Sequence, residues 1–157
     1  MIEIGLISDT HGLLRADVHT ALAGVSLILH AGDVGGDEIL DELALIAPVQ
    51  AVFGNTDAPG QPRLAAERVV NVDGVRIHLS HGYEVGRPTA RRLVAAYPGF
   101  GVIVYGHTHV SKIERVDDVL VVNPGGAGPR RFGLAPSVAR LTVHERTAEA
   151  VVVTLDG

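Results

Sequence analysis

The sequence predicts an α/β fold in which two packed, mixed β-sheets are flanked by helices. Three observations support this prediction. Short apolar runs rich in valine, isoleucine and leucine recur along the 157 residues, separated by glycine and proline. The first three runs alternate with helical segments, which is typical of parallel strands joined by right-handed crossovers. The later runs form hairpins, which add antiparallel strands.

The first half of the chain has a β-α-β-α-β order. Residues 2–8 are predicted to form a buried strand, followed by a polar loop and a helix over about 15–23. Residues 25–30 form the second strand, and a helix over about 36–46 leads to a third strand at 49–53. We expect these three strands to lie parallel.

The second half is dominated by hairpin signals. Asp73-Gly74 joins two apolar runs and is a strong hairpin signal. Asp117-Asp118 is the expected turn of a second hairpin. The predicted elements are strands at 68–73 and 75–80, a helix near 88–97, a strand at 101–105, a hairpin over 110–122, and a closing pair at 137–144 and 148–155. The chain has no internal repeat or linker, so we expect a single domain over residues 1–157.

Composition and charge restrict the partners and the site chemistry. The net charge is -5 and the arginines are mostly scattered, which argues against binding to long nucleic acid. No apolar run is long enough to span a membrane and no export signal is evident, so we expect a cytoplasmic protein without membrane contact. The chain has no cysteine, so any metal must be held by His, Asp, Glu or Asn. Assembly into a homo-oligomer stays open, because no specific residue supports it.

Polar side chains suited to metal binding follow five of the predicted strands. Functional residues of open α/β sheets collect beyond the carboxyl ends of the strands. Each of these sites includes a glycine, which lets the backbone turn sharply. The five blocks are Asp9-Thr10-His11-Gly12, Gly32-Asp33, Gly54-Asn55-Thr56-Asp57, His81-Gly82 and Gly106-His107-Thr108-His109.

These donors predict a site for two divalent cations. Oxygen and nitrogen ligands without sulfur suit manganese, iron, zinc, cobalt or nickel better than a structural zinc site. The side chains outnumber what one catalytic ion with open positions needs. A carboxylate such as Asp33 could bridge two ions about 3.5–4 Å apart. Manganese is our first choice.

The five ordered blocks resemble the signature of calcineurin-like metallophosphoesterases, over residues 2 to about 141. The short chain, the 6–12 segment and Asn123-Pro124-Gly125 resemble the small bacterial and archaeal phosphodiesterase branch, which is also similar to the retromer subunit Vps29. The resemblance implies Asp33 as a bridging ligand. It implies the remaining ligands as Asp9, His11 and His109 for one ion and Asn55, His81 and His107 for the other.

The resemblance implies a phosphodiesterase that hydrolyses a small phosphate ester by attack of metal-activated hydroxide, with Asp33, Asn55 and His81 as catalytic residues. Thr56 occupies a position where many larger relatives have histidine. A threonine hydroxyl cannot serve as a general acid near pH 7, so we expect a preference for good leaving groups. Thr56 and Arg130 are candidate substrate contacts. Arg130 and its neighbour Arg131 are equally compatible with a solvated loop.

Two other functions compete with this one. The first is a non-catalytic protein-interaction module of the Vps29 type, and the second is a phosphatase of dinucleoside polyphosphates or phosphoproteins. All seven candidate ligands are present, which favours an enzyme over the module. The insertions that would build a large substrate pocket are absent, which argues against the phosphatase.

The remaining polar residues have structural interpretations. His30 lies on a buried strand and is interpreted as a hydrogen-bonded core residue. Asp57 is expected to support the loop around Asn55. The three histidines interpreted as surface residues are His19, His78 and His144. Tyr83 replaces a second histidine of many relatives and is expected to alter the substrate rim.

Overall fold

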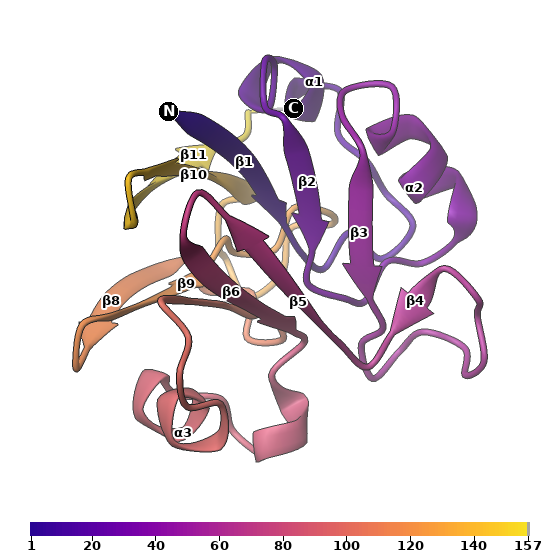
Figure 1. Cartoon of the computed structure of the whole chain (residues 1–157). Helices are drawn as coiled ribbons and strands as arrows, with labels where there is room; N and C mark the ends of the chain where they lie inside the picture. The colour runs from indigo at the N-terminus through magenta and orange to yellow at the C-terminus, as the bar shows by residue number, and fades with distance from the viewer. Residues whose placement is uncertain (157) are drawn as a thin grey trace.

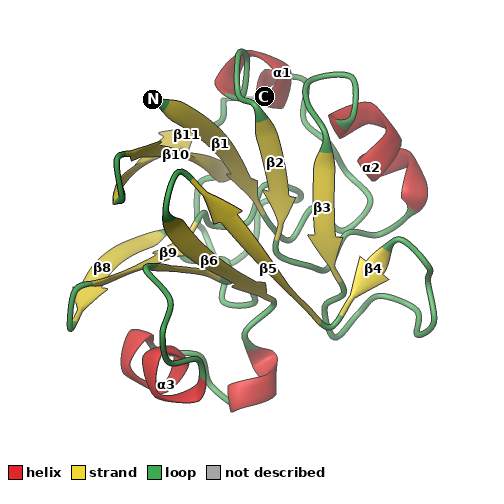
Figure 2. Cartoon of the chain, in the orientation of Figure 1, coloured by secondary structure: helices red, strands yellow, loops and turns green. Residues whose placement is uncertain are grey.

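The computed structural model describes residues 1–156, which form two β-sheets packed face to face (Figures 1 and 2). The first sheet has the order β11-β10-β1-β2-β3-β4. In it, β1, β2, β3 and β4 are parallel and β10 runs antiparallel to β1. The strands are β1 (Ile2–Ile7), β2 (Leu27–His30), β3 (Val49–Val52), β4 (Leu64–Ala65), β10 (Ser137–His144) and β11 (Thr147–Thr154).

The second sheet has the order β5-β6-β7-β9-β8. Its central strands β6, β7 and β9 are parallel, and two antiparallel hairpins complete it. The strands are β5 (Glu67–Val72), β6 (Val75–Ser80), β7 (Val102–Val104), β8 (Lys112–Val116) and β9 (Val119–Asn123). Both sheets are mixed, so the predicted fold class is confirmed.

Alternating side chains of the strands divide the core into layers. Ile4 and Leu6 of β1 point into the apolar layer between the sheets, whereas Ile7 points to the outer face. Helices α1 (Asp17–Ala21) and α2 (Asp37–Leu43) cover that outer face. Helix α3 (Ala90–Ala96) covers the outer face of the second sheet (Figure 1). Among the helices of residues 1–156, none is long and apolar enough to cross a membrane.

The expected hairpin turns are present. Asp73 and Gly74 between β5 and β6 have φ values of 44° and 81°. Asp117 and Asp118 between β8 and β9 have φ values of 48° and 68°. Positive φ at both central residues is the geometry of a two-residue type I′ turn, whose twist matches the strands it connects.

The structure corrects the interpretation of His78 as a surface residue. Its side chain is 1 % exposed, its Nε2 lies 2.7 Å from Glu67 Oε2, and its ring stacks on Tyr97 at 3.7 Å. His78 does point away from the core between the sheets, as alternation requires, but the α3 segment covers that face. The structure also contains two short elements that were not predicted from the sequence. They are strand β4 and the 3₁₀ helix η1 (Tyr83–Val85).

Candidate metal centre

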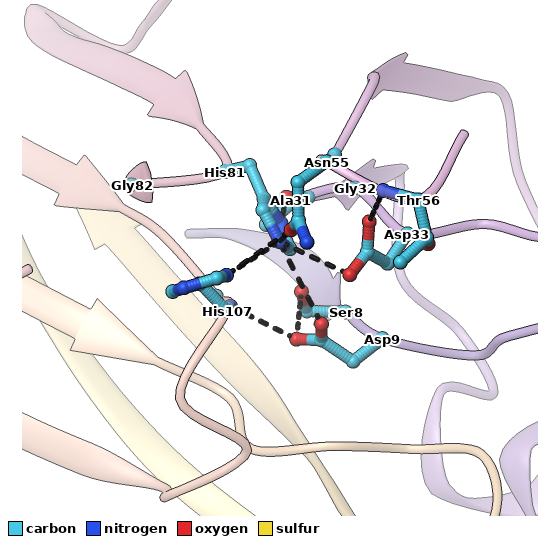
Figure 3. Close-up of polar contacts among 12 residues, drawn as sticks. Ser8, Asp9, Ala31, Gly32, Asp33, Asn55, Thr56, His81, Gly82 and His107 are labelled. Atoms are coloured by element: carbon cyan, nitrogen blue, oxygen red, sulfur yellow. Dashed lines mark hydrogen bonds and ion pairs between the residues drawn. The ribbon is translucent and has the colours of Figure 1, made fainter. Parts of the chain in front are cut away.

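The loops that follow the strands bring all seven predicted ligands together. Figure 3 shows five of them, namely Asp9, Asp33, Asn55, His81 and His107. The first sheet contributes the loops after β1, β2 and β3, and the second sheet contributes those after β6 and β7. The sheets thus face each other across the site. The residues are Asp9, His11, Asp33 and Asn55 from the first sheet and His81, His107 and His109 from the second.

One group consists of Asp9, His11 and His109, whose ligand atoms all lie within 4.8 Å of one another. The Nε2 atoms of His11 and His109 are 3.4 Å apart. Asp9 Oδ1 lies 3.7 Å from His11 Nε2 and 3.5 Å from His109 Nε2. Three donor atoms therefore surround one small volume.

A second group lies beside the first. His81 Nε2 is 3.1 Å from Asn55 Oδ1 and 3.3 Å from Asp33 Oδ2. His107 Nδ1 is 3.2 Å from the same Asn55 oxygen and 3.3 Å from His81 Nε2. These four side chains enclose a second volume with nitrogen and oxygen donors.

Two carboxylates lie between the groups. Asp33 Oδ2 is 3.7 Å from His11 Nε2 in the first group, besides its contact with His81 in the second. Asp9 Oδ1 is 3.8 Å from His81 Nε2 and forms a second cluster with Asp33 and His81. The geometry that suits Asp33 to a bridging position therefore extends to Asp9.

The hydrogen bond at His81 Nδ1 directs its Nε2 atom into the cluster. The Nδ1–H donates to the Ala31 carbonyl at 2.7 Å, and Nε2 faces the oxygens of Asp33 and Asn55. Acceptors that face one another need a proton or a metal ion between them. Burial alone would lower the pKa of His81, but hydrogen bonding to Asp33 and the charge of Asp9 outweigh it and raise that pKa.

Asp9 gives the clearest sign that the site fits a metal ion. Its Oδ2 accepts hydrogen bonds from Ser8 Oγ at 2.7 Å and from His107 N–H at 3.1 Å. Its Oδ1 is buried and has no hydrogen-bond partner within residues 1–156. Burial raises the pKa of Asp9 to about 6, although the positive charge of His81 opposes this. A buried oxygen without a partner is costly, and a bound cation would satisfy it.

The other site residues have the ionisation states that metal binding requires. Burial, together with the charges of His11 and Arg131, lowers the pKa of His109 to about 4. Burial also lowers the pKa values of His11 and His107. The pKa of Asp33 falls because hydrogen bonding to His81 and Thr56 outweighs burial. Near pH 7 these histidines are thus neutral with free lone pairs, and Asp33 is ionised.

The backbone of the site is strained, and glycines permit its close contacts. Non-glycine residues rarely adopt positive φ, and clusters of them mark functional sites. A Cβ atom on Gly106 would collide with Ser8 and with the Asp9 carboxylate, and one on Gly54 would collide with Asp33. Positive φ occurs at Asp9 (55°), His11 (47°), Asp33 (55°), His107 (75°) and His109 (64°).

Neighbouring residues position this cluster. The backbone N–H of Thr56 donates to Asp33 Oδ1 at 2.9 Å, while the Thr56 side chain is exposed. Asp57 accepts hydrogen bonds from three backbone N–H groups, including that of Gly54 at 2.8 Å, which confirms its structural interpretation. His30 is buried and bonds to Thr10 at 3.0 Å, which confirms its interpretation as well.

Arg130 and Arg131 are both exposed. The positive charge of Arg131 contributes to lowering the pKa values of His11 and His109. Arg130 is the candidate substrate contact predicted from the sequence, and Arg131 follows the same glycine-rich loop. Only the course of that loop determines which guanidinium lies nearer the histidines.

Comparison with known proteins gives concordant matches. A family model for the calcineurin-like phosphoesterase superfamily domain matches residues 2–146. A probable metallophosphoesterase of Methanothermobacter thermautotrophicus is 35% identical, covering 98% of this chain and 86% of that protein. A phosphodiesterase of Methanocaldococcus jannaschii is 25% identical, covering 97% and 99%. Zinc-bound Vps29 of Entamoeba histolytica has a TM-score of 0.79 at 23% identity, covering 98% and 99%, and shares the fold.

Proposed function

The chain belongs to the calcineurin-like phosphoesterase superfamily, and we propose that it is a phosphodiesterase that hydrolyses a small phosphate ester at a site for two divalent cations. The observation that carries the proposal is the convergence of the seven side chains in two adjoining groups, with the buried Asp9 Oδ1, which has no hydrogen-bond partner within residues 1–156, near His11, His81 and His109. The phosphodiesterase name of the Methanocaldococcus jannaschii relative supports the same reaction class.

In this proposal, each side chain has a defined role. Asp33 lies between the two cation positions and Arg131 contributes positive charge near one of them. When bound, divalent cations polarise a phosphoryl oxygen and lower the pKa of water. Manganese is the first choice, with nickel, iron, cobalt and zinc as alternatives. Asp9, His11 and His109 would hold one cation, and Asn55, His81 and His107 would hold the other.

The residues around the ligands set the geometry in which a phosphate would be held. The Ala31 carbonyl fixes the orientation of His81, and the Thr56 N–H fixes Asp33. Asn55 offers an oxygen without a negative charge. The site therefore repels a phosphate less than it would if a third carboxylate stood at this position beside Asp9 and Asp33. Arg131 adds attraction for an anionic ester.

The test uses metal-free protein and bis(p-nitrophenyl) phosphate, with manganese, nickel, cobalt, zinc and magnesium added singly. We expect metal-dependent hydrolysis that Asp33→Asn and His109→Ala both abolish. His144→Ala, which removes an exposed histidine of β10, serves as the matched control and should leave the rate unchanged. Stoichiometric metal binding without turnover would contradict the proposal and favour a non-catalytic interaction module.

A further inference from the structure

An apolar hollow with a volume of about 440 Å³ opens beside the candidate metal centre. Phe53, Pro59 and Tyr83 line it, and Asn55 belongs both to the hollow and to the ligand cluster. Its volume falls within the range of small-molecule sites, which are mostly apolar with a few polar groups. A phosphate held at the cluster would therefore direct one substituent toward these rings.

The aromatic wall lies directly against the ligands. The Tyr83 ring centroid is 5.7 Å from that of His81 and 6.2 Å from that of His107. Phe53 directly precedes Gly54-Asn55, and its half-buried ring packs against the core beside α2. The two aromatic residues thus come from the loops that also provide metal ligands, one from each sheet.

Hydrogen bonds of Glu84 hold the backbone beside Tyr83, whose side chain is exposed. Glu84 accepts a hydrogen bond from Gly82 N–H at 2.9 Å and another from the Tyr97 hydroxyl at 2.8 Å. The first bond lies within the η1 turn, and the second ties that turn to Tyr97 at the end of α3. A backbone held in this way keeps Tyr83 at the rim of the site, so less freedom is lost when its ring contacts a ligand.

The carboxylate of the hollow is already engaged. The Asp57 carboxylate accepts N–H groups from Val34, Gly35 and Gly54, so it serves the loop. Besides Asn55, which the hollow shares with the ligand cluster, the remaining side chains are two aromatic rings and a proline, which favour a flat, apolar ligand over a charged chain. An aromatic ring is the chemical group that fits these walls.

We propose that this hollow binds a planar aromatic substituent of the phosphate ester, such as an aryl group or a nucleobase. The inference rests on the proposed function, because it takes the phosphate to lie at the metal centre. Tyr83 and Phe53 are then specificity-determining residues that touch the substrate. Aryl and nucleobase esters both present a flat aromatic ring to the hollow, and the test distinguishes between them.

The test measures equilibrium binding of non-hydrolysable phosphonates to manganese-loaded protein by isothermal titration calorimetry. Phenylphosphonate should bind about tenfold more tightly than methylphosphonate, because its ring is removed from water. Tyr83→Ala should reduce this ratio to about twofold, and Tyr83→Phe should preserve it. Pro59→Ala should also reduce the affinity ratio, and it serves as the test variant if Tyr83→Ala does not fold. A second pair of ligands tests the nucleobase. If 2-(adenin-9-yl)ethylphosphonate also binds about tenfold more tightly than ethylphosphonate, the hollow accepts nucleobases. If these two ligands bind equally, the hollow is restricted to aryl esters.

Different results would overturn different parts. Equal binding of phenylphosphonate and methylphosphonate would refute the pocket and leave the phosphodiesterase proposal intact. A preference that survives both Tyr83→Ala and Pro59→Ala would also refute it. If neither phosphonate bound the metal-loaded protein, the phosphate site itself would be wrong, and both proposals would fail together.

Discussion

The buried carboxylate of Asp9 is the residue with the clearest electrostatic consequence. Its pKa of about 6 in the folded protein exceeds the ordinary value of 3.8, so the folded state binds its proton more tightly. This group therefore stabilises the metal-free protein only at low pH, and the contribution is lost as the pH rises through about 6. A neutral side chain at this position should escape that loss.

We predict that Asp9→Asn stabilises the metal-free protein at pH 8 by about 2 kcal/mol relative to wild type. The difference should shrink as the pH falls from 6 to 4, because Asp9 then takes up its proton. Urea unfolding in the presence of a chelator at pH 4.5 and pH 8 measures this. Glu149→Gln, an exposed change on β11, is the control. A difference that is the same at both pH values would contradict the burial argument.

Thr56 is expected to limit the range of leaving groups. We predict that Thr56→His raises kcat/KM for methyl phenyl phosphate relative to bis(p-nitrophenyl) phosphate by about 10²-fold, since a general acid can protonate a poor leaving group. Steady-state kinetics with both esters gives this ratio. Thr56→Asn should leave it unchanged, and an unchanged ratio in Thr56→His would show that the added imidazole does not reach the leaving group.

Some site residues could be predicted from the sequence because the signal is local. Asp9 and His107 follow strand ends in short ordered motifs, and the sheet topology brings such ends together. The role of Arg131 depends instead on the path of a loop, and the burial of His78 depends on a helix packed from a distant part of the chain. Neither leaves a local pattern that distinguishes it.

At the scale of elements, the turn of the β8–β9 hairpin contains a strained residue that a substitution should relieve. Asp118 adopts a φ of 68°, where glycine is favoured, whereas the β5–β6 hairpin already has Gly74 at the matching position. We predict that Asp118→Gly raises the free energy of unfolding by about 0.5–1 kcal/mol. Denaturant unfolding measures the gain. The converse change, Gly74→Ala, should destabilise the protein, and a loss in Asp118→Gly would show that the turn is not strained.

The strands and helices were predictable where their patterns are long. The Asp73-Gly74 and Asp117-Asp118 turns and the alternating apolar runs each specify an element by themselves. Strand β4 has two residues and exists because β3 offers an edge for Leu64 and Ala65. Helix η1 depends on the tertiary hydrogen bond between Glu84 and Tyr97. Elements this short contain too few residues to show a periodic pattern of apolar side chains, so the sequence does not predict them.

On the scale of the whole molecule, the candidate metal centre joins the two sheets. We predict that manganese raises the melting temperature, because ligands from both sheets are held together only in the folded state. At a hundred times the dissociation constant the gain is about 2.7 kcal/mol, which corresponds to about 5–10 °C for a chain of this size. Differential scanning calorimetry with manganese or a chelator measures it.

His81→Ala should abolish this metal-dependent shift, and His144→Ala should retain it. A shift that persists in His81→Ala would place the stabilising ion elsewhere. His81 follows a strand of the second sheet and contacts Asp33 and Asn55 of the first. Its loss therefore removes a contact that joins the two sheets at the site.

The pairing of β1 with β10 has a consequence for how the protein is made. Strand β1 is synthesised before every other strand of its sheet, yet its neighbour on one side is formed only when the ribosome reaches residues 137–144. All seven ligand positions have been translated by residue 109. A growing chain therefore passes through a stage in which every ligand exists while the central strand still exposes an edge. Aggregation and chaperone binding are expected to concentrate in that interval.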